Sequence, residues 1–329
     1  MRPDPRPPER AGERGAALLT VLMLVAVIAV MAGAGLEKLR LSTRLAGNAA
    51  AVEQARAYAV AAEALAMVRV GDLLSQSNQR VTLLGDWSGR PFGLPLPGGG
   101  VATARVSDGG NCFNLNSLAL QVTPGVYATN FGARVQFTRL LRLIGIPAQV
   151  AEQVAGSTAD WIDTDDEQQV SGAEDARYTG QQLPYRTGGT LMADRSELRA
   201  VAGMTPELYT QIRPWVCTLP TVSPARINVN TLLPERAPLL AMLAPDTVSV
   251  EAARQQLLRR PLQGWSDPAA VWTGMTAPIE AGQQTAVTTG WFDLAIDVSL
   301  PGAQVEEHAL IDATRLPVGL VSRQWGEET

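Results

Sequence analysis

The first 70 residues constrain the fold most, because they contain a long apolar run that continues, without a proline, into a second stretch of helix-favouring residues. Between Ala16 and Leu36 the only polar side chain is that of Thr20. These residues would form ~31 Å of α-helix, enough to cross the hydrocarbon core of a membrane. A secretory signal has a shorter apolar region of ~7–15 residues. The length therefore favours a retained anchor over a discarded signal, although residues 32–34 could serve as a cleavage site.

The helical pattern does not stop where the apolar run ends. After Glu37 and Lys38 it continues to about Val70 in residues that favour helix, with apolar positions at mixed three- and four-residue steps. The sequence predicts one helix of roughly 50 residues, apolar in its first half and amphipathic in its second. The apolar positions expected to pack in the second half are Leu39, Leu41, Leu45, Val52, Tyr58, Ala62 and Leu65.

Charge argues against a role in nucleic-acid binding. The whole chain has a net charge of −5, and its first 15 residues carry four arginines against three acidic residues, so the remainder is net −6. An acidic body would repel a phosphate backbone. Lys38 is the only lysine, which indicates a compositional bias toward arginine and makes the arginine content uninformative.

Beyond the long helix the chain changes character three times. Glycine and proline are frequent at first, with short alternating pieces at 81–84 and 101–108; helical patterns return from about Tyr127; alternation returns at 288–300 and 306–316. The final WGEET is expected to be loose. This order predicts an α+β fold, in which a helical domain interrupts a sheet domain. The expected segments are a leader at 1–15, the long helix at 16–70, the first part of the sheet domain at 71–124, the inserted helical domain at 125–282, and the remaining strands with the tail at 283–329.

Two pieces of the helical region resemble helix-hairpin-helix units, at 198–212 and 227–243. Such modules often bind DNA phosphates through backbone amides and a helix end. Their turns here lack the cluster of basic residues that phosphate contact requires, and Asp194, Glu207 and Glu235 lie nearby instead. We therefore interpret them as compact helical packing and expect no nucleic-acid partner.

The strongest chemical signal is an acidic segment, ADWIDTDDEQQVSGAED, at residues 159–175. Its carboxylates would repel one another unless they were solvated or shared a cation. Oxygen ligands without histidine or cysteine favour Ca²⁺ over Zn²⁺ or copper. The spacing approaches that of an EF-hand loop, but Gln168 stands where that loop needs glycine. A solvated acidic loop without a bound ion remains the alternative.

The opening of the chain resembles the type IV pilin family, whose members have a short basic leader ending in glycine and then a long anchoring helix. The resemblance implies cleavage by prepilin peptidase between Gly15 and Ala16, and methylation of the new amino terminus. Most pilins carry glutamate at the fifth mature position, which here is Thr20. A buried carboxylate is costly without a positive partner, so a subunit without it would suit the filament tip. An ordinary single-span anchored protein is the alternative.

Further motifs resemble one pilin subfamily, the large K-type minor pseudopilins of type II secretion systems. They are CFNLNSL at 112–118, the acidic segment, LPYRTGG, SELRAVAG, IRPWVCTLP and INVNT, in that order. The resemblance implies a pilin-like fold with a long N-terminal helix packed on an antiparallel sheet, and a large inserted α-helical domain of helix-hairpin-helix or SAM-like type. It also implies Ca²⁺ binding by the acidic segment. The implied ligands are Asp163, Asp165, Glu167, Glu174 and Asp175.

The same resemblance implies a location and partners. The chain is expected to span the bacterial inner membrane once, with its C-terminal body in the periplasm. It would sit at the tip of a periplasmic pseudopilus and start the filament with I-type and J-type minor pseudopilins, with the H-type as a further candidate partner. The alternative function is a permanently membrane-anchored, calcium-dependent periplasmic binding module.

The two cysteines and the single histidine complete the list of candidate residues. Cys112 and Cys217 would lie in an oxidising compartment, where a pair without a nearby histidine is more naturally a disulfide than a metal site. Two separate buried thiols remain possible. His308 lies in an expected strand without a recognisable catalytic partner, and the PGGG at 97–100 lacks the helix and lysine of a phosphate-binding loop. We expect no enzymatic activity.

Overall fold

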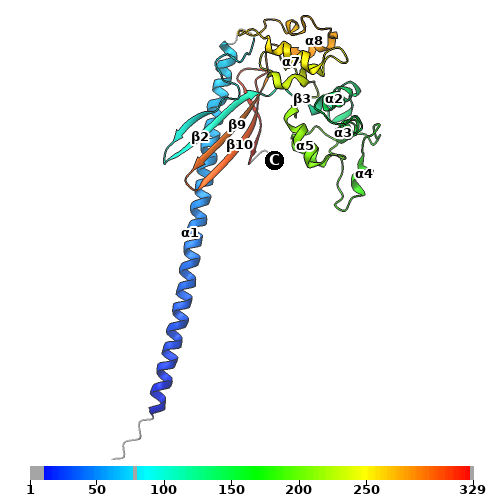
Figure 1. Cartoon of the computed structure of the whole chain (residues 1–329). Coiled ribbons are helices and arrows are strands. Elements are labelled where there is room, and N and C mark those ends of the chain that lie inside the picture. The colour runs from blue at the N-terminus through cyan, green and yellow to red at the C-terminus, as the bar shows by residue number, and fades with distance from the viewer. Residues whose placement is uncertain (1–10, 77–79, 327–329) are drawn as a thin grey trace, which may run out of the picture.

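A computed structural model describes residues 11–76 and 80–326, with side chains from residue 16 onward. Figure 1 shows a long helix, α1, that carries a head of two lobes at one end. The helices are α1 Ala11–Gln76, α2 Phe131–Leu143, α3 Ala148–Ile162, α4 Asp175–Thr179, α5 Pro206–Ile212, α6 Ala237–Ala241, α7 Val250–Leu258 and α8 Ile279–Gln284. The 3-10 helices are η1 Leu115–Leu118, η2 Arg195–Ala200, η3 Arg213–Trp215, η4 Pro234–Arg236 and η5 Pro268–Trp272.

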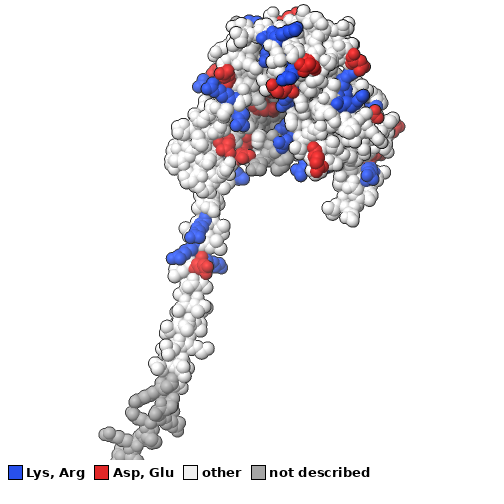
Figure 2. Space-filling view, in the orientation of Figure 1, with Lys and Arg blue, Asp and Glu red and all other residues white. Residues whose placement is uncertain are grey.

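The first half of α1 stands clear of the head. Its apolar residues have no neighbours from the rest of the chain, and the helix is long and apolar enough to cross a membrane. Figure 2 shows a small charged group on the helix beneath the head, and no charged side chain between that group and the grey end. The 66 residues of α1 correspond to ~99 Å of helix. The helix ends six residues after the predicted Val70, at Gln76.

The second half of α1 packs on the sheet through small side chains. Its buried stripe, at steps of three and four residues, is Ala55, Ala59, Ala62, Ala66 and Val70. Of the positions predicted to pack, Ala62 is buried and Val52 and Tyr58 are half-buried against the sheet core, whereas Leu39, Leu41 and Leu45 are about as exposed as the apolar residues before them. Alanine lets a helix axis approach a sheet closely, so the alanines rather than the leucines form the contact.

A five-stranded antiparallel sheet forms the first lobe together with α1. Its strand order is β1-β2-β9-β10-β11, so segments far apart in sequence meet at the β2–β9 pair. One face, including Ala104, Phe292 and Ile296, packs against α1 in a single apolar core. The strands are β1 Phe92–Leu96, β2 Gly100–Asp108, β9 Trp291–Leu300, β10 Ala303–Asp312 and β11 Gly319–Trp325.

The second lobe, here called the helical lobe, is built on a separate core of residues between Phe113 and Ala281. Helices α2 and α3 pack against each other and on η1, and Figure 1 shows them with α5 beside the sheet lobe and α7 and α8 above it. Three two-stranded sheets join its connecting segments to one another. They are β3 Phe113–Asn114 with β6 Val216–Cys217, β4 Ala119–Thr123 with β5 Val126–Thr129, and β7 Ile227–Asn228 with β8 Thr285–Ala286.

Three sequence predictions differ from the structure. Residues 81–84, predicted as an alternating piece of strand, are irregular, although the Val81 amide donates to the Val287 carbonyl oxygen at 2.8 Å. The expected helix-hairpin-helix at 227–243 begins instead with β7. The tail predicted to be loose is ordered at its start, because Trp325 ends β11 and Gly326 donates to the Glu306 carbonyl oxygen. Residues 327–329 lie outside the described residues.

Candidate metal centre

The acidic segment brings three carboxylates together just beyond α3. Helix α3 ends at Ile162, and its C-cap residue, Asp163, already has extended backbone. Carboxylate oxygens of Asp163, Asp165 and Glu174 all lie within 4.8 Å of one another, a spacing that a single cation could bridge. Asp163 and Glu174 are buried, and Asp165 is exposed, so the group opens to solvent on one side.

Several oxygens of this group have no partner within the described chain. Oδ1 of Asp163 and both carboxylate oxygens of Glu174 are buried without a hydrogen bond. Burial raises the pKa of Asp163 to about 6. Burial and then repulsion from the surrounding aspartates raise the pKa of Glu174 to about 8. Buried oxygens without donors are costly in the apo protein, and a hard divalent cation would satisfy them. The donor set therefore fits Ca²⁺.

Two residues hold Asp163 and its neighbours in place. The Thr129 hydroxyl at the end of β5 donates to Asp163 Oδ2 at 2.5 Å. The Thr164 hydroxyl donates to the Tyr127 carbonyl oxygen at 3.0 Å, and the Tyr127 amide donates back to that hydroxyl at 3.2 Å. The β4–β5 hairpin thus fixes the first turn of the acidic segment.

Asp160 closes the segment from the other side. Its fully buried carboxylate accepts the Gln169 amide at 3.2 Å on each oxygen, so the segment folds back over the end of α3. Burial is also the main reason why the pKa of Asp160 rises to about 6. Gly172 lies so close that a Cβ on it would overlap Asp160 Oδ2. This position therefore requires glycine.

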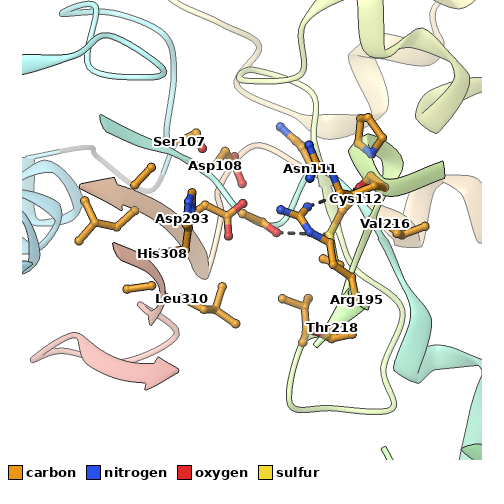
Figure 3. A pocket seen from close by; sticks show the side chains of 18 of the residues that line it. Ser107, Asp108, Asn111, Cys112, Arg195, Val216, Thr218, Asp293, His308 and Leu310 are labelled. Carbon is orange, nitrogen blue, oxygen red and sulfur yellow. Dashed lines mark hydrogen bonds between the residues drawn. A yellow bond between two sulfur atoms is a disulfide. The ribbon is translucent and has the colours of Figure 1, made fainter. Parts of the chain in front are cut away.

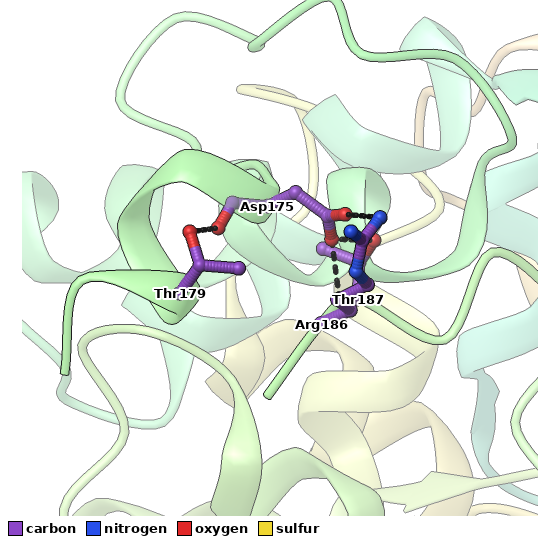
Figure 4. Close-up of polar contacts among 4 residues, drawn as sticks. All are labelled: Asp175, Thr179, Arg186 and Thr187. Atoms are coloured by element: carbon purple, nitrogen blue, oxygen red, sulfur yellow. Dashed lines mark hydrogen bonds and ion pairs between the residues drawn. The ribbon is translucent and has the colours of Figure 1, made fainter. Parts of the chain in front are cut away.

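Two of the predicted ligands lie outside the group of three. Glu167 is exposed, and its backbone amide donates to Asp165 Oδ1 at 2.9 Å. Asp175 begins α4 and accepts the Thr187 amide at 2.9 Å, the Thr187 hydroxyl at 3.0 Å and Arg186 Nη1 at 3.1 Å, as Figure 4 shows. Hydrogen bonds from Thr187, the strongest being from its amide, lower the pKa of Asp175. The Asp175 carboxylate thus ties α4 to the following loop.

The residues that sequence reasoning missed lack a local signal. Thr129 stands 34 residues before Asp163, in a strand with no charge pattern. Asp160 was visible as one of seven acidic residues, but spacing alone did not separate it from the ligand candidates. Asp160 lies one helical turn before Asp163 in the last part of α3, where every residue from Val154 to Ile162 is buried, so no helical periodicity marks it.

The asparagines of CFNLNSL explain why that motif is ordered. The Asn114 side chain accepts the Leu219 amide at 3.0 Å and donates to the carbonyl oxygens of Thr221 and Ser223. Asn116 exchanges hydrogen bonds with the Met192 backbone, at 2.8 and 3.0 Å, and donates to the Leu219 carbonyl oxygen at 2.9 Å. These buried amides join three loops of the helical lobe.

Cys112 and Cys217 form a disulfide, with their Cα atoms 5.8 Å apart. It stands beside a cavity of about 500 Å³ between the outer face of the sheet and the helical lobe. Figure 3 shows Asp293 and His308 on the sheet side and Arg195 on the opposite side. Burial raises the pKa of Asp293 to about 6, although its carboxylate faces the cavity and water can reach it. Figure 2 shows the recess between the lobes on this side.

The predicted processing residues lie near the free end of α1. Gly15 and Ala16 are within the helix, but the leader up to residue 10 and the side chains before Ala16 lie outside the described residues. Thr20 faces outward, and its hydroxyl donates to the Ala17 carbonyl oxygen at 2.9 Å. The helix therefore satisfies this polar group internally within its apolar stretch.

Comparisons with known proteins agree with this architecture. Two family models described as "Type II secretion system (T2SS), protein K" match residues 111–221 and 227–289. The type II secretion system protein K of Pectobacterium carotovorum subsp. carotovorum is 32% identical over 96% of this chain and 98% of that protein. That of Klebsiella pneumoniae is 34% identical over 95% of this chain and 97% of its own length.

A solved structure matches as well. The chain superposes on a chain of the GspK-GspI-GspJ complex from the type 2 secretion system of enterotoxigenic Escherichia coli, with a TM-score of 0.72 and 30% sequence identity. The match covers 84% of this chain and 97% of that chain. The fold therefore recurs in a relative over most of this chain.

Proposed function

The chain belongs to the protein K family of the type II secretion system, a family of minor pseudopilins, and we propose that it caps the tip of the pseudopilus. The shape of the head supports this proposal most directly. The helical lobe adds a second core beside the sheet lobe, and it overhangs one side of α1 (Figure 1). If α1 packs with other helices in a filament, a head of this width leaves no room for a subunit stacked above it.

The apolar half of α1 serves as a single inner-membrane anchor before assembly. Its side chains from Leu18 to Met31 are exposed in the isolated chain, and either lipid or neighbouring helices can cover them. We place the head in the periplasm, where the Cys112–Cys217 disulfide would be stable. Prepilin peptidase would cut between Gly15 and Ala16 on the cytoplasmic side, after which the new amino terminus would be methylated.

Thr20 supports the position at the tip. A pilin with glutamate at this point would carry a carboxylate in its apolar stretch, which needs a positive partner from a neighbouring subunit. The Thr20 hydroxyl already has its partner within the helix. The chain would therefore enter the filament through groups that its partner subunits provide, and without a carboxylate of its own at this position. The relative in the GspK-GspI-GspJ complex supports I-type and J-type pseudopilins as those partners, and an H-type subunit would follow them.

We further propose that Ca²⁺ binds to Asp163, Asp165 and Glu174 and fixes the acidic segment on the helical lobe. The buried oxygens of Asp163 and Glu174 without hydrogen bonds support this proposal. Ca²⁺ takes six to eight oxygen ligands, so backbone oxygens or waters would complete its shell. The ion would act structurally, by cancelling the repulsion among the carboxylates. The alternative of a permanently anchored binding module has no observation in its favour beyond this same site.

The position at the tip is tested on filaments from the host. Pseudopili are sheared from cells that carry an epitope tag after residue 326 of this chain, and the tag is labelled with gold. Label at one end of each filament is the expected result, whereas label along the filament would contradict the cap. Intact mass on the membrane-bound pool provides the control for processing. A chain that begins at a methylated Ala16 is expected, and one that retains Met1 would contradict entry into the filament.

A further inference from the structure

A buried cluster of charged groups joins α1 to the last strand of the sheet. Arg323 of β11 donates to both carboxylate oxygens of Glu63 in the head-packed half of α1, through Nε at 2.8 Å and Nη2 at 2.7 Å. Glu307 of β10 lies on the same side of the sheet, with its Oε1 3.5 Å from Arg323 Nε. Glu63 is 4% exposed and Glu307 is fully buried, so two buried carboxylates share one guanidinium, whose own side chain is 30% exposed at the edge of the sheet.

The charges of this cluster do not balance if both carboxylates are ionised. Both oxygens of Glu307 are buried without a hydrogen bond, and a buried anion in that state is costly. Among the described residues, Arg56 of α1 also faces the cluster and stacks on Trp325 at 5.7 Å from the ring centroid, while Arg323 stacks at 5.9 Å. The Arg56 guanidinium is already paired with Glu53 at 2.8 Å, so its charge does not offset that of Glu307. From β9, the residue paired with Glu307 is the apolar Ile296.

We propose that Glu307 keeps its proton as a carboxylic acid, donates a hydrogen bond to the Glu63 carboxylate, and thereby forms, with Arg323, a proton-linked clamp between α1 and β11. One proton makes the cluster neutral, because the acid, the carboxylate and the guanidinium then carry 0, −1 and +1. Loss of that proton to solvent leaves a net charge of −1 beneath Trp325. Burial, followed by the neighbouring Glu63, raises the pKa of Glu307 to about 7, so the change falls near neutral pH.

The sign of the effect follows from this raised pKa. The clamp stabilises the fold fully below the ordinary glutamate pKa of 4.5, and the stabilisation is lost as pH rises through about 7. The contribution to the folding equilibrium constant should therefore fall on the order of 50-fold between about pH 5 and about pH 8. Loosening should be greatest in β11, which is an edge strand and pairs only with β10 among the described strands.

The test compares the full chain in detergent with its Glu307→Gln variant, which keeps a donor to Glu63 but cannot ionise. Denaturant unfolding followed by tryptophan fluorescence gives the folding equilibrium constant at each pH. The wild type should lose stability relative to Glu307→Gln as pH rises, and the β11 amides should exchange hydrogen faster in the wild type at about pH 8. Glu306→Gln is the matched control, since its side chain lies on the other face of the same strand. Parallel pH profiles for all three chains would overturn the proposal.

A second measurement serves if Glu307→Gln fails to fold. Infrared spectra of the full chain with ¹³C-labelled glutamate, in a Glu174→Gln background, should show the carbonyl band of a protonated carboxyl group at about pH 6. The band should disappear as pH rises through about 7. Absence of the band at about pH 6 would show that Glu307 is ionised in the folded protein and would overturn the clamp.

Discussion

The Thr129 hydroxyl donates to one oxygen of the Asp163 carboxylate at 2.5 Å, while the other oxygen of that carboxylate is buried without a hydrogen bond. This arrangement fixes the rotation of a carboxylate that belongs to the same group as Asp165 and Glu174, and leaves one of its oxygens free to bind a cation. A residue from a strand thereby positions a candidate ligand on a loop, although 34 residues separate the two in sequence.

Thr129→Val should weaken Ca²⁺ binding about tenfold, the lower end of the range for residues that orient metal ligands. Calorimetric titration of calcium into the chelator-treated full chain measures the change. Thr138→Val is the matched control, because the Thr138 hydroxyl bonds only to the Arg134 carbonyl oxygen within α2. Equal affinity in the two variants would contradict the positioning role of Thr129.

Calcium should raise the melting temperature of the head, and Glu174→Gln should abolish that increase. At 100 times the dissociation constant a ligand stabilises by about 2.7 kcal/mol, which corresponds to about 5 °C or more for a head of this size. Without calcium the variant should melt higher than the wild type, because it removes a buried carboxylate whose pKa burial raises to about 8. Differential scanning calorimetry with calcium and with chelator measures both effects.

Glu167→Gln provides the comparison for that experiment. Glu167 is exposed and outside the group of three, so its calcium-dependent shift should equal that of the wild type. A shift that disappears in Glu167→Gln but persists in Glu174→Gln would move the site along the segment and contradict the assignment.

The acidic segment illustrates how far sequence alone reached. Residue types predicted the kind of ligand, and Asp163, Asp165 and Glu174 do come together. Spacing also favoured Glu167, because an EF-hand-like count assumes a continuous loop, and the family resemblance implied Asp175. The chain instead turns back where Asp160 accepts the Gln169 amide. That turn depends on a buried helix end, which one-dimensional spacing does not describe.

The fold shows the same division. The long helix was predictable from helix formers without a proline, and β9 and β10 from their alternation. The packing face of α1 was not, because the closeness of the sheet selects Ala59 and Ala66 over larger apolar side chains. Strand β11 was not predicted, because it is an edge strand with both faces largely exposed to solvent, and such a strand shows little alternation of polar and apolar residues.

Asn116→Ala should destabilise the helical lobe by about 2–4 kcal/mol, because it removes one buried amide and leaves backbone groups of Met192 and Leu219 without partners. Denaturant unfolding of the full chain gives the change in the free energy of unfolding. Asn48→Ala, at an exposed position of α1, serves as the control substitution. A loss below about 0.5 kcal/mol would mean that solvent replaces these bonds.

Removal of the disulfide should destabilise the head without changing its fold. The Cys112→Ala, Cys217→Ala double variant opens a loop of 105 residues, which in the chain-entropy model costs up to about 4.7 kcal/mol. Melting of the variant, compared with the wild type in oxidising and in reducing buffer, measures the loss. The wild type in reductant should approach the variant. Two reactive thiols in unreduced, denatured wild type would show that the bridge does not form in the cell.

Thr20→Glu tests whether the missing charge matters for the position at the tip. A carboxylate near the start of the apolar stretch would cost at most about 2.5–3.5 kcal/mol in lipid, the value for the centre of a membrane helix, and no positive partner is expected for a subunit that assembles first. We expect an unchanged amount of chain in the membrane fraction but reduced export of the host's secreted proteins. Thr20→Val, which removes the hydroxyl bond to Ala17 without adding charge, should behave as wild type. Normal export with Thr20→Glu would show that the missing charge is incidental, and the tip proposal would then stand on the shape of the head alone.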